Sequence, residues 1–128
     1  MAYCVSPLDG RYRDKITDVN ELFSDFMFTR FKVSVECEYL YFILNTLRIP
    51  IKNNYQNLIG EFMVNFSYKD VEQINEIEKQ TKHDIQAIVV YLKTKFPEFA
   101  EYVHFGLTSQ DINSPAMVYT YKVFNESI

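Results

Sequence analysis

The sequence predicts an all-α fold, and three observations lead to this class. Apolar residues recur three and four positions apart in successive segments, which is the spacing of one face of a helix. The chain has only three glycines and four prolines, too few for a turn-rich all-β fold. Its 128 residues, 48% apolar and 23% charged, have the composition of one globular domain or of a piece of a larger one.

The first helical pattern follows an irregular arm over residues 1–16, where Ser6-Pro7 and Asp9-Gly10 are typical of turns. Asp18 is a candidate N-cap, and Glu21 follows three residues later, as in a capping box. The apolar positions of this helix are Val19, Leu22, Phe23, Phe26 and Met27.

Residues 31–47 carry two patterns. Residues 31–39 alternate between apolar and polar side chains, which favours a strand, and the β-branched residues support that alternative. The helical stripe continues past the alternating section and ends before Pro50, so we expect one long helix. Its inward positions are Val33, Cys37, Leu40, Leu44 and Leu47.

Three more helices are expected before residue 100. Residues 54–66 place six apolar side chains on one face: Tyr55, Leu58, Ile59, Phe62, Met63 and Phe66. Ser67 and Asp70 then form a capping box for a mostly polar helix with Val71, Ile74 and Ile77 inward. A helix from about His83 to Lys95 is apolar nearly all round, which predicts burial on several sides, and Pro97 ends it.

The last helix spans about 109–124, with Ile112, Ala116, Tyr119 and Val123 as its apolar positions. Two starts compete for it. Thr108 and Asp111 form a capping box, whereas Ser114 before Pro115 is a rival start, because proline is favoured at the first helical position. A short turn followed by a kink at Pro115 would satisfy both.

Composition also excludes several classes of protein. The net charge of −4 argues against nonspecific nucleic-acid binding, and no apolar run reaches the roughly 18 residues needed for a membrane span. The N-terminus lacks the apolar core of a signal peptide. The two cysteines predict neither a disulfide framework nor a zinc site, so a cytoplasmic location is expected. Ten tyrosines and eleven phenylalanines imply more apolar surface than one small core can bury.

Three polar clusters are candidate ligand sites. Residues 6–15 place Arg11, Tyr12, Arg13 and Lys15 after a tight turn, which suits a phosphate group, or else forms a solvated arm. Residues 81–84 put His83 and Asp84 at a helix start, where free backbone N–H groups can bind an anion. The structural alternative is Asp84 as the N-cap with a partly buried, hydrogen-bonded His83.

The third cluster spans residues 104–113. Gly106 allows a ligand to approach the backbone closely, and Thr108 and Ser109 offer two hydroxyls to a carboxylate. The structural alternative is a plain helix start. The chain shows no nucleophile triad, metal cluster or glycine-rich dinucleotide loop.

Taken together, the three clusters resemble the adenylosuccinate lyase family of the fumarase/aspartase superfamily. Their order and spacing match the N-terminal part of that family, and the resemblance runs from residue 6 to the end of the chain. The matching segments are Ser6-Pro7-Leu8-Asp9-Gly10-Arg11-Tyr12, Thr81-Lys82-His83-Asp84 and His104-Phe105-Gly106-Leu107-Thr108-Ser109-Gln110-Asp111-Ile112-Asn113.

The resemblance implies substrate-binding roles for eight residues. Arg11 and Tyr12 match the pair that binds the nucleotide phosphate, and His104 matches a histidine near the substrate. Thr108 and Ser109 match the pair that holds a carboxylate of the succinyl group. Lys82, His83 and Asp84 match the stretch that lines the nucleotide site. Pro115, just past the third motif, departs from the family pattern and puts the local helix direction in doubt.

The resemblance also implies an architecture and a reaction. It divides the chain into an N-terminal helical domain, 1–112, and the start of a long central-bundle helix, 113–128. The implied reaction is β-elimination of fumarate from a nucleotide, without a cofactor or metal, in a homotetramer. The general acid and base of the family lie beyond residue 128, so no catalytic residue is expected here and the chain alone is expected to be inactive. The alternatives are another fumarate-forming lyase of the superfamily and a non-catalytic helical interaction module.

Overall fold

The computed structural model describes residues 24–51 and 54–127, and no strand occurs among them. The all-α prediction is therefore confirmed. In chain order the elements are α2 (Asp25–Thr46), α3 (Tyr55–Val64), α4 (Tyr68–Thr81), α5 (Asp84–Lys95), the 3₁₀ helix η2 (Pro97–Tyr102) and α6 (Ser109–Ser127).

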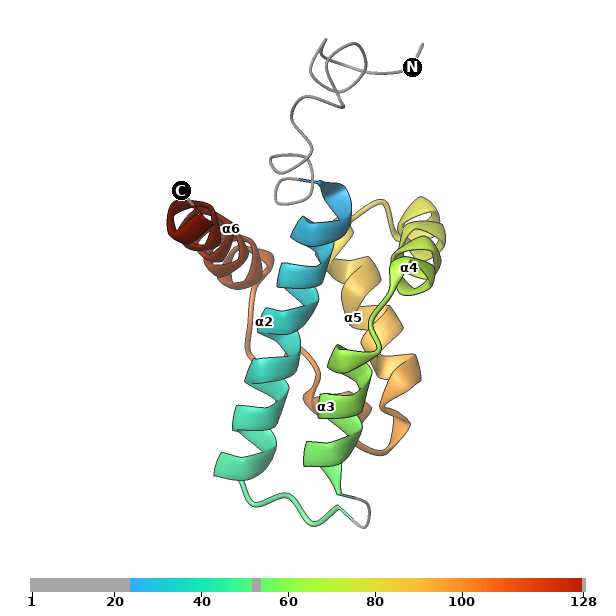
Figure 1. The fold of residues 1–128 in the computed structure, drawn as a ribbon. Coiled ribbons are helices and arrows are strands. Elements are labelled where there is room, and N and C mark those ends of the chain that lie inside the picture. The colour runs from blue at the N-terminus through green and yellow to red at the C-terminus, as the bar shows by residue number, and fades with distance from the viewer. Residues whose placement is uncertain (1–23, 52–53, 128) are drawn as a thin grey trace, which may run out of the picture.

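Helix α2 is the central element (Figure 1): α6 packs on one side of it, and α3, α4 and α5 lie on the other. The expected helix over 31–47 is confirmed, and the strand alternative is wrong. The helix begins earlier than expected, at Asp25, so Phe26 and Met27 belong to it and not to a separate helix. Ser24 caps α2 by accepting a hydrogen bond from the Met27 N–H. The proposed cap at Asp18 lies outside the described residues.

The core follows the predicted apolar stripes. Four α2 positions are fully buried: Val33, Cys37, Leu40 and Leu44. They meet the buried face of α5 and Phe99 of η2, together with Ile112 at the start of α6. Three predicted inward residues, Leu47, Leu58 and Tyr119, are instead largely exposed. Leu47 follows the last residue of α2 as its C-cap, where the chain leaves the helical face.

The predicted start of α4 and the predicted span of α5 are confirmed. The capping box of Ser67 and Asp70 starts α4, with the Ser67 N–H donating to the Asp70 carboxylate over 2.8 Å. Helix α5 ends at Lys95, two residues before Pro97, as proline sterics require. A second oxygen of Asp70 accepts a hydrogen bond from the Tyr91 hydroxyl, which ties α4 to α5.

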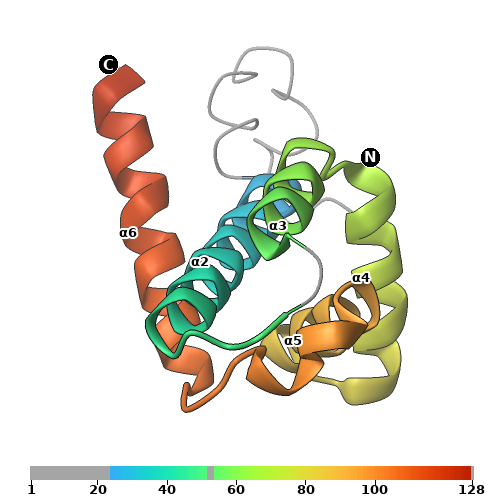
Figure 2. The ribbon, with the colours of Figure 1, turned by 90° about the horizontal axis from the view of Figure 1, so that it is seen from below.

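Helix α6 begins at Ser109 and contains Pro115 in its interior, so the rival start at Ser114 is wrong. Its inward positions are Ile112, Ala116 and Thr120, four residues apart. Figure 2 shows the C-terminal half of α6 extending away from the other helices. The predicted boundary at 112/113 lies inside this helix and stays a prediction.

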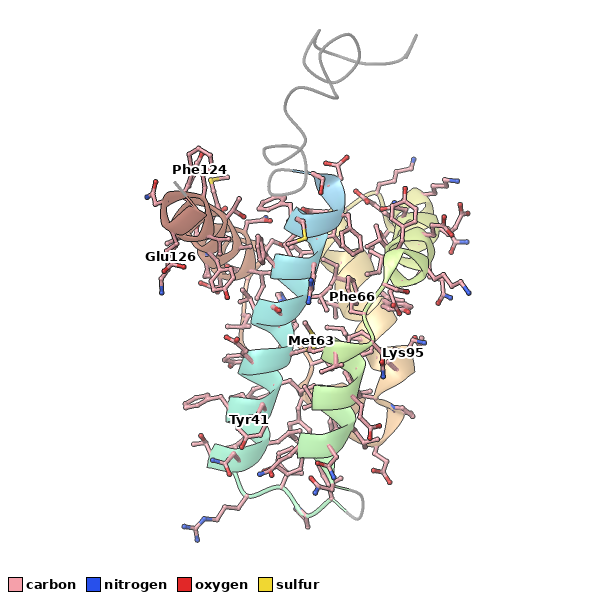
Figure 3. The ribbon with its side chains drawn as sticks, viewed as in Figure 1. Tyr41, Met63, Phe66, Lys95, Phe124 and Glu126 are labelled. Atoms are coloured by element: carbon pink, nitrogen blue, oxygen red, sulfur yellow. The ribbon has the colours of Figure 1, made fainter. Side chains whose placement is uncertain are left out.

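Side chains at the periphery show how much apolar surface remains outside the core (Figure 3). Tyr41 of α2 faces α3, where its ring centre lies 5.9 Å from that of Tyr55, and Phe124 lies near the C-terminal end of α6. The most exposed large apolar residues of α6 are Met117, Val118, Tyr119 and Tyr121. The predicted surplus of apolar surface is therefore present on the described part of the chain.

Candidate functional site

Polar side chains from three elements meet beside the N-terminal half of α2. We call this group the polar cluster: Lys32 and Glu36 of α2, His83 and Asp84 at the start of α5, His104 in the turn before α6, and Ser109 at the start of α6. Two helix starts thus converge on one face of α2. The structure brings together four of the residues predicted from the sequence, His83, Asp84, His104 and Ser109, and adds two that were not predicted.

The first link of the polar cluster joins α2 to α5. The Lys32 ammonium donates to a carboxylate oxygen of Asp84 over 2.8 Å, and it lies 4.2 Å from the ring centre of Phe28. Partial burial raises the pKa of Asp84. The hydrogen bond from Lys32, the hydrogen bond from the Ile85 backbone and the charges of Lys32 and His83 together outweigh burial, so the pKa lies below its ordinary value. Asp84 is therefore a carboxylate held by a cation.

The second link joins α5 to α6 through His83. This histidine is the N-cap of α5, and its Nδ1 accepts the backbone N–H of Gln86 over 3.3 Å. Because Nδ1 accepts, the neutral ring carries its proton on Nε2. Nε2 lies 3.4 Å from the Ser109 hydroxyl oxygen and can donate to it. The Ser109 proton is then free to point at a ligand.

The third link joins α2 to the turn before α6. Nδ1 of His104 lies 2.5 Å from Oε1 of Glu36, whose side chain is 0% exposed. Burial raises the pKa of Glu36, and the charge and hydrogen bond of His104 offset part of this rise. The ring of His104 keeps 18% of its surface exposed, so it connects a buried carboxylate to the molecular surface.

Thr108 has a mainly local role. Its backbone N–H and its hydroxyl both donate to Asp111, over 2.8 and 3.0 Å. These two bonds lower the pKa of Asp111, and the bond from the Thr108 N–H is one half of the predicted capping box. The observed contacts of Thr108 are therefore those of a residue that starts a helix, which was the structural alternative to a ligand site. The Ser109 hydroxyl is not used in this box.

The remaining predicted site residues lie apart from these contacts. Lys82 is the exposed C-cap of α4 and adopts a left-handed backbone with φ of 57°. It adjoins the polar cluster through its neighbour His83. Arg11 and Tyr12 lie outside the described residues, so the proposed phosphate arm stays a prediction.

Lys32 and Glu36 are the members of the polar cluster that sequence reasoning missed. Charged residues are normally assigned to the solvent side of a helix, and the alternating pattern of residues 31–39 gave these two no special weight. A signal was present, however. They precede the buried Leu40 and Leu44 at four-residue steps along α2. Residues four apart lie on the same face of a helix, so a helical wheel places both at the edge of the buried stripe.

The described residues contain neither a membrane-spanning helix nor a candidate metal site. No helix of the described part is long and apolar enough to cross a membrane. Within residues 24–51 and 54–127, no group of three or more His, Cys, Asp and Glu side chains is placed to hold a metal ion.

The fold and the polar cluster together define an all-α domain with a hydrogen-bonding site where two helix starts converge. Comparison with known proteins is more specific. No family model matches the chain. Curated relatives do: the chain is 36% identical over 120 residues to the adenylosuccinate lyase of Haemophilus influenzae, covering 86% of this chain and 26% of that protein.

Two further relatives extend the match. Identity is 34% over 134 residues to the adenylosuccinate lyase of Buchnera aphidicola, covering 98% of this chain and 29% of that protein. It is 34% over 125 residues to that of Dictyostelium discoideum, covering 88% and 27%. The chain thus resembles adenylosuccinate lyases, which confirms the resemblance found in its three motifs. It spans about a quarter of the length of these relatives.

Proposed function

We propose that this chain is part of an adenylosuccinate lyase, a carbon–nitrogen lyase of cytoplasmic purine biosynthesis. The observation that carries the proposal is the 34–36% identity to adenylosuccinate lyases over 86–98% of the chain. The reaction is β-elimination of fumarate from adenylosuccinate, which leaves AMP, and from the succinylated aminoimidazole carboxamide ribotide. The general acid and base are supplied by parts of the lyase that this chain does not span.

In this proposal the polar cluster binds the succinyl part of the substrate. Removing a proton next to a carboxylate gives a doubly charged aci-carboxylate, whose negative charge is the main barrier to the reaction. Donors already held in place stabilise such charge without reorganising. The Ser109 hydroxyl is such a donor, because His83 Nε2 occupies its acceptor side. The Thr108 hydroxyl is used by Asp111, so we place Ser109 first and Thr108 second in this role.

The nucleotide binds along the neighbouring segments. Arg11 and Tyr12 hold its phosphate, and Lys82, His83, Asp84 and His104 line the site. The exposed position of Lys82 supports a role toward an anionic ligand, since its ammonium can reach solvent. The pairing of Asp84 with Lys32 supports the same role, because it offsets the negative charge that Asp84 would otherwise present to the substrate.

We further propose that the complete lyase is a homotetramer and that residues 113–128 begin a helix of its central bundle. The support is the exposed apolar surface of α6, where Val118 is 66% exposed and lies beside Met117 and Tyr119. Contiguous apolar surface of this kind is typical of a face that another chain covers.

The substitution Ser109→Ala in the complete lyase tests the proposed binding of the succinyl group. We expect kcat to fall by about 10-fold or more and KM to rise, because a hydrogen bond to developing charge is stronger in the transition state. Steady-state fumarate release measures both constants, and thermal melting reports the stability of the fold.

The matched control is Ser114→Ala, an exposed serine of the same helix that accepts a hydrogen bond from Gln110. This variant should keep normal kinetics. If Ser109→Ala lowers only the melting temperature and leaves kcat and KM unchanged, Ser109 is a helix-start residue and its proposed binding role is wrong.

A further inference from the structure

Glu36 is a buried carboxylate that core packing does not explain. Its side chain is 0% exposed and lies beside the apolar stripe of α2, an unusual place for a charged group. Moving a carboxylate out of water is costly unless it gains a charged or hydrogen-bonding partner. Oε1 has one, Nδ1 of His104 at 2.5 Å, whereas Oε2 has none among the described residues. The His104 ring is therefore what compensates the burial of this carboxylate.

The turn that carries His104 is held by other contacts. The Tyr39 hydroxyl donates to the Phe105 carbonyl over 2.6 Å, and the Leu107 N–H donates to the His104 carbonyl over 3.1 Å. His104 itself has a left-handed backbone with φ of 61°. Because the backbone is fixed independently, the Glu36 contact acts mainly on the orientation and protons of the imidazole ring.

The contact with Glu36 determines whether the other ring nitrogen of His104, Nε2, carries a hydrogen. The pair is electrically neutral in two arrangements: an ionised Glu36 with a doubly protonated ring, or a protonated Glu36 that donates to Nδ1. In both, Nε2 carries a hydrogen. Nε2 becomes bare only if the ring is neutral and protonated on Nδ1 beside an ionised Glu36, which leaves an uncompensated charge in the core.

We propose that Glu36 is a positioning residue for His104: it orients the ring through Nδ1 and keeps a hydrogen on Nε2, which donates to a carboxylate or phosphate oxygen of the ligand. The inference rests on the proposed function in one respect, that His104 belongs to the substrate site. Nε2 is free for this role, because no contact of it occurs among the described residues.

Two other charges near the pair come from different elements. Lys32 stands one turn before Glu36 on α2 and bonds to Asp84 of α5. Asp111 of α6 bonds to Thr108, and the charge of His104 helps to lower the pKa of Asp111. Both are bonded elsewhere, so the direct partner of the ring is Glu36.

A double-mutant cycle in the complete lyase tests the inference. Glu36→Gln should lower kcat/KM by about 10- to 100-fold, the usual effect of removing a group that orients a functional histidine. The double variant Glu36→Gln/His104→Gln should be no slower than His104→Gln alone, because Glu36 acts through that ring. Glu38→Gln, an exposed glutamate on the same helix, is the matched control and should keep the parental kinetics.

The outcomes separate the two proposals. If the effects of Glu36→Gln and His104→Gln multiply, Glu36 acts independently and the inference is overturned. If His104→Gln leaves kinetics unchanged in an active lyase, the role of His104 fails and the inference fails with it, while the lyase function stands. If the complete protein releases no fumarate, the proposed function itself is wrong.

A spectroscopic measurement on the unmodified chain covers the case in which Glu36→Gln does not fold. The chain has only two histidines, so ¹⁵N-labelled rings are readily assigned. Near neutral pH, Nε2 of His104 should show the ¹⁵N chemical shift of a protonated nitrogen. A bare Nε2 beside a protonated Nδ1 would overturn the inference whatever the activity of the lyase.

Discussion

Lys32 and Glu36 place opposite charges one helical turn apart on α2, yet each bonds to a different segment. Lys32 pairs with Asp84 at the start of α5, and Glu36 pairs with His104 before α6. Buried charges contribute little net stability, because desolvation opposes their attraction. Their directional bonds do fix where two helix starts lie relative to α2. At the residue scale, α2 is therefore both a core helix and the base of the polar cluster.

The Lys32–Asp84 pair predicts a specific dependence of stability on pH. The pKa of Asp84 is lower in the folded chain than its ordinary value of about 3.9, so ionised Asp84 stabilises the fold above that pH. This contribution is lost as the pH falls through the lowered pKa. Urea unfolding at a series of pH values should show parent and Asp84→Asn differing near neutral pH and converging in acid.

Glu72→Gln, at an exposed position of α4, is the control for a general loss of negative charge. It should follow the parent at every pH. If Asp84→Asn stays equally far below the parent from neutral to strongly acidic pH, the difference does not come from ionised Asp84.

Local chemistry determines which residues of the polar cluster could be found from the sequence. His83, His104 and Ser109 belong to short motifs that can be recognised in the sequence, and the structure brings all three beside α2. Lys32 and Glu36 acquire their roles from partners 52 and 68 residues away, a relation that no local pattern contains. Asp84 as the N-cap of α5 is wrong: the cap is His83, a residue type that is not among the usual N-caps.

At the scale of elements, helix boundaries were predictable where a local hydrogen bond or proline sets them. Ser67 with Asp70 and Pro97 are examples, and both predictions are confirmed. Which face of a helix is buried was harder to predict. The predicted inward position of Tyr119 is wrong. The buried residues of α6 are Ile112, Ala116 and Thr120, which are spaced four residues apart, and the third of them is a polar threonine that an apolar pattern does not reveal.

Pro115 provides a prediction at the same scale. It stands inside α6, where it lacks the N–H that would bond to the Asp111 carbonyl, and its side chain is exposed. Pro115→Ala should therefore raise the free energy of unfolding, by up to about 3 kcal/mol, the difference between the two residues in a helix interior. Urea unfolding followed by circular dichroism measures the change.

Met117→Ala, two residues on and also exposed, should change stability far less and serves as the control. A loss of stability in Pro115→Ala would contradict the expectation. It would mean that the proline fixes a helix direction on which the packing of α6 against α2 depends.

At the scale of the whole molecule, the exposed face of α6 should matter in the assembly. We expect Val118→Glu to reduce the proposed tetramer of the complete lyase to smaller species, because a charge would be buried between chains. Size-exclusion chromatography with light scattering measures the mass, and circular dichroism checks that the fold is kept. Val64→Glu changes an 82% exposed valine of α3 and should leave the assembly intact. A tetramer unaffected by Val118→Glu would place the interface elsewhere.

The activity of the chain by itself is the remaining prediction at this scale. The polar cluster contributes donors for a carboxylate, but the proposal assigns both proton transfers to parts of the lyase that this chain, a quarter of its relatives' length, does not span. Without an acid that protonates the departing nitrogen and a base that removes the proton, the elimination loses two catalytic groups, each of which raises the rate by about 10²- to 10⁴-fold. Adenylosuccinate incubated with the 128-residue chain at high concentration should therefore release no fumarate above background, while the adenylosuccinate lyase of Haemophilus influenzae serves as the positive control. Fumarate release at a rate near that of the control would show that the acid and base lie within these residues, and the proposal that other parts of the lyase supply them would be wrong.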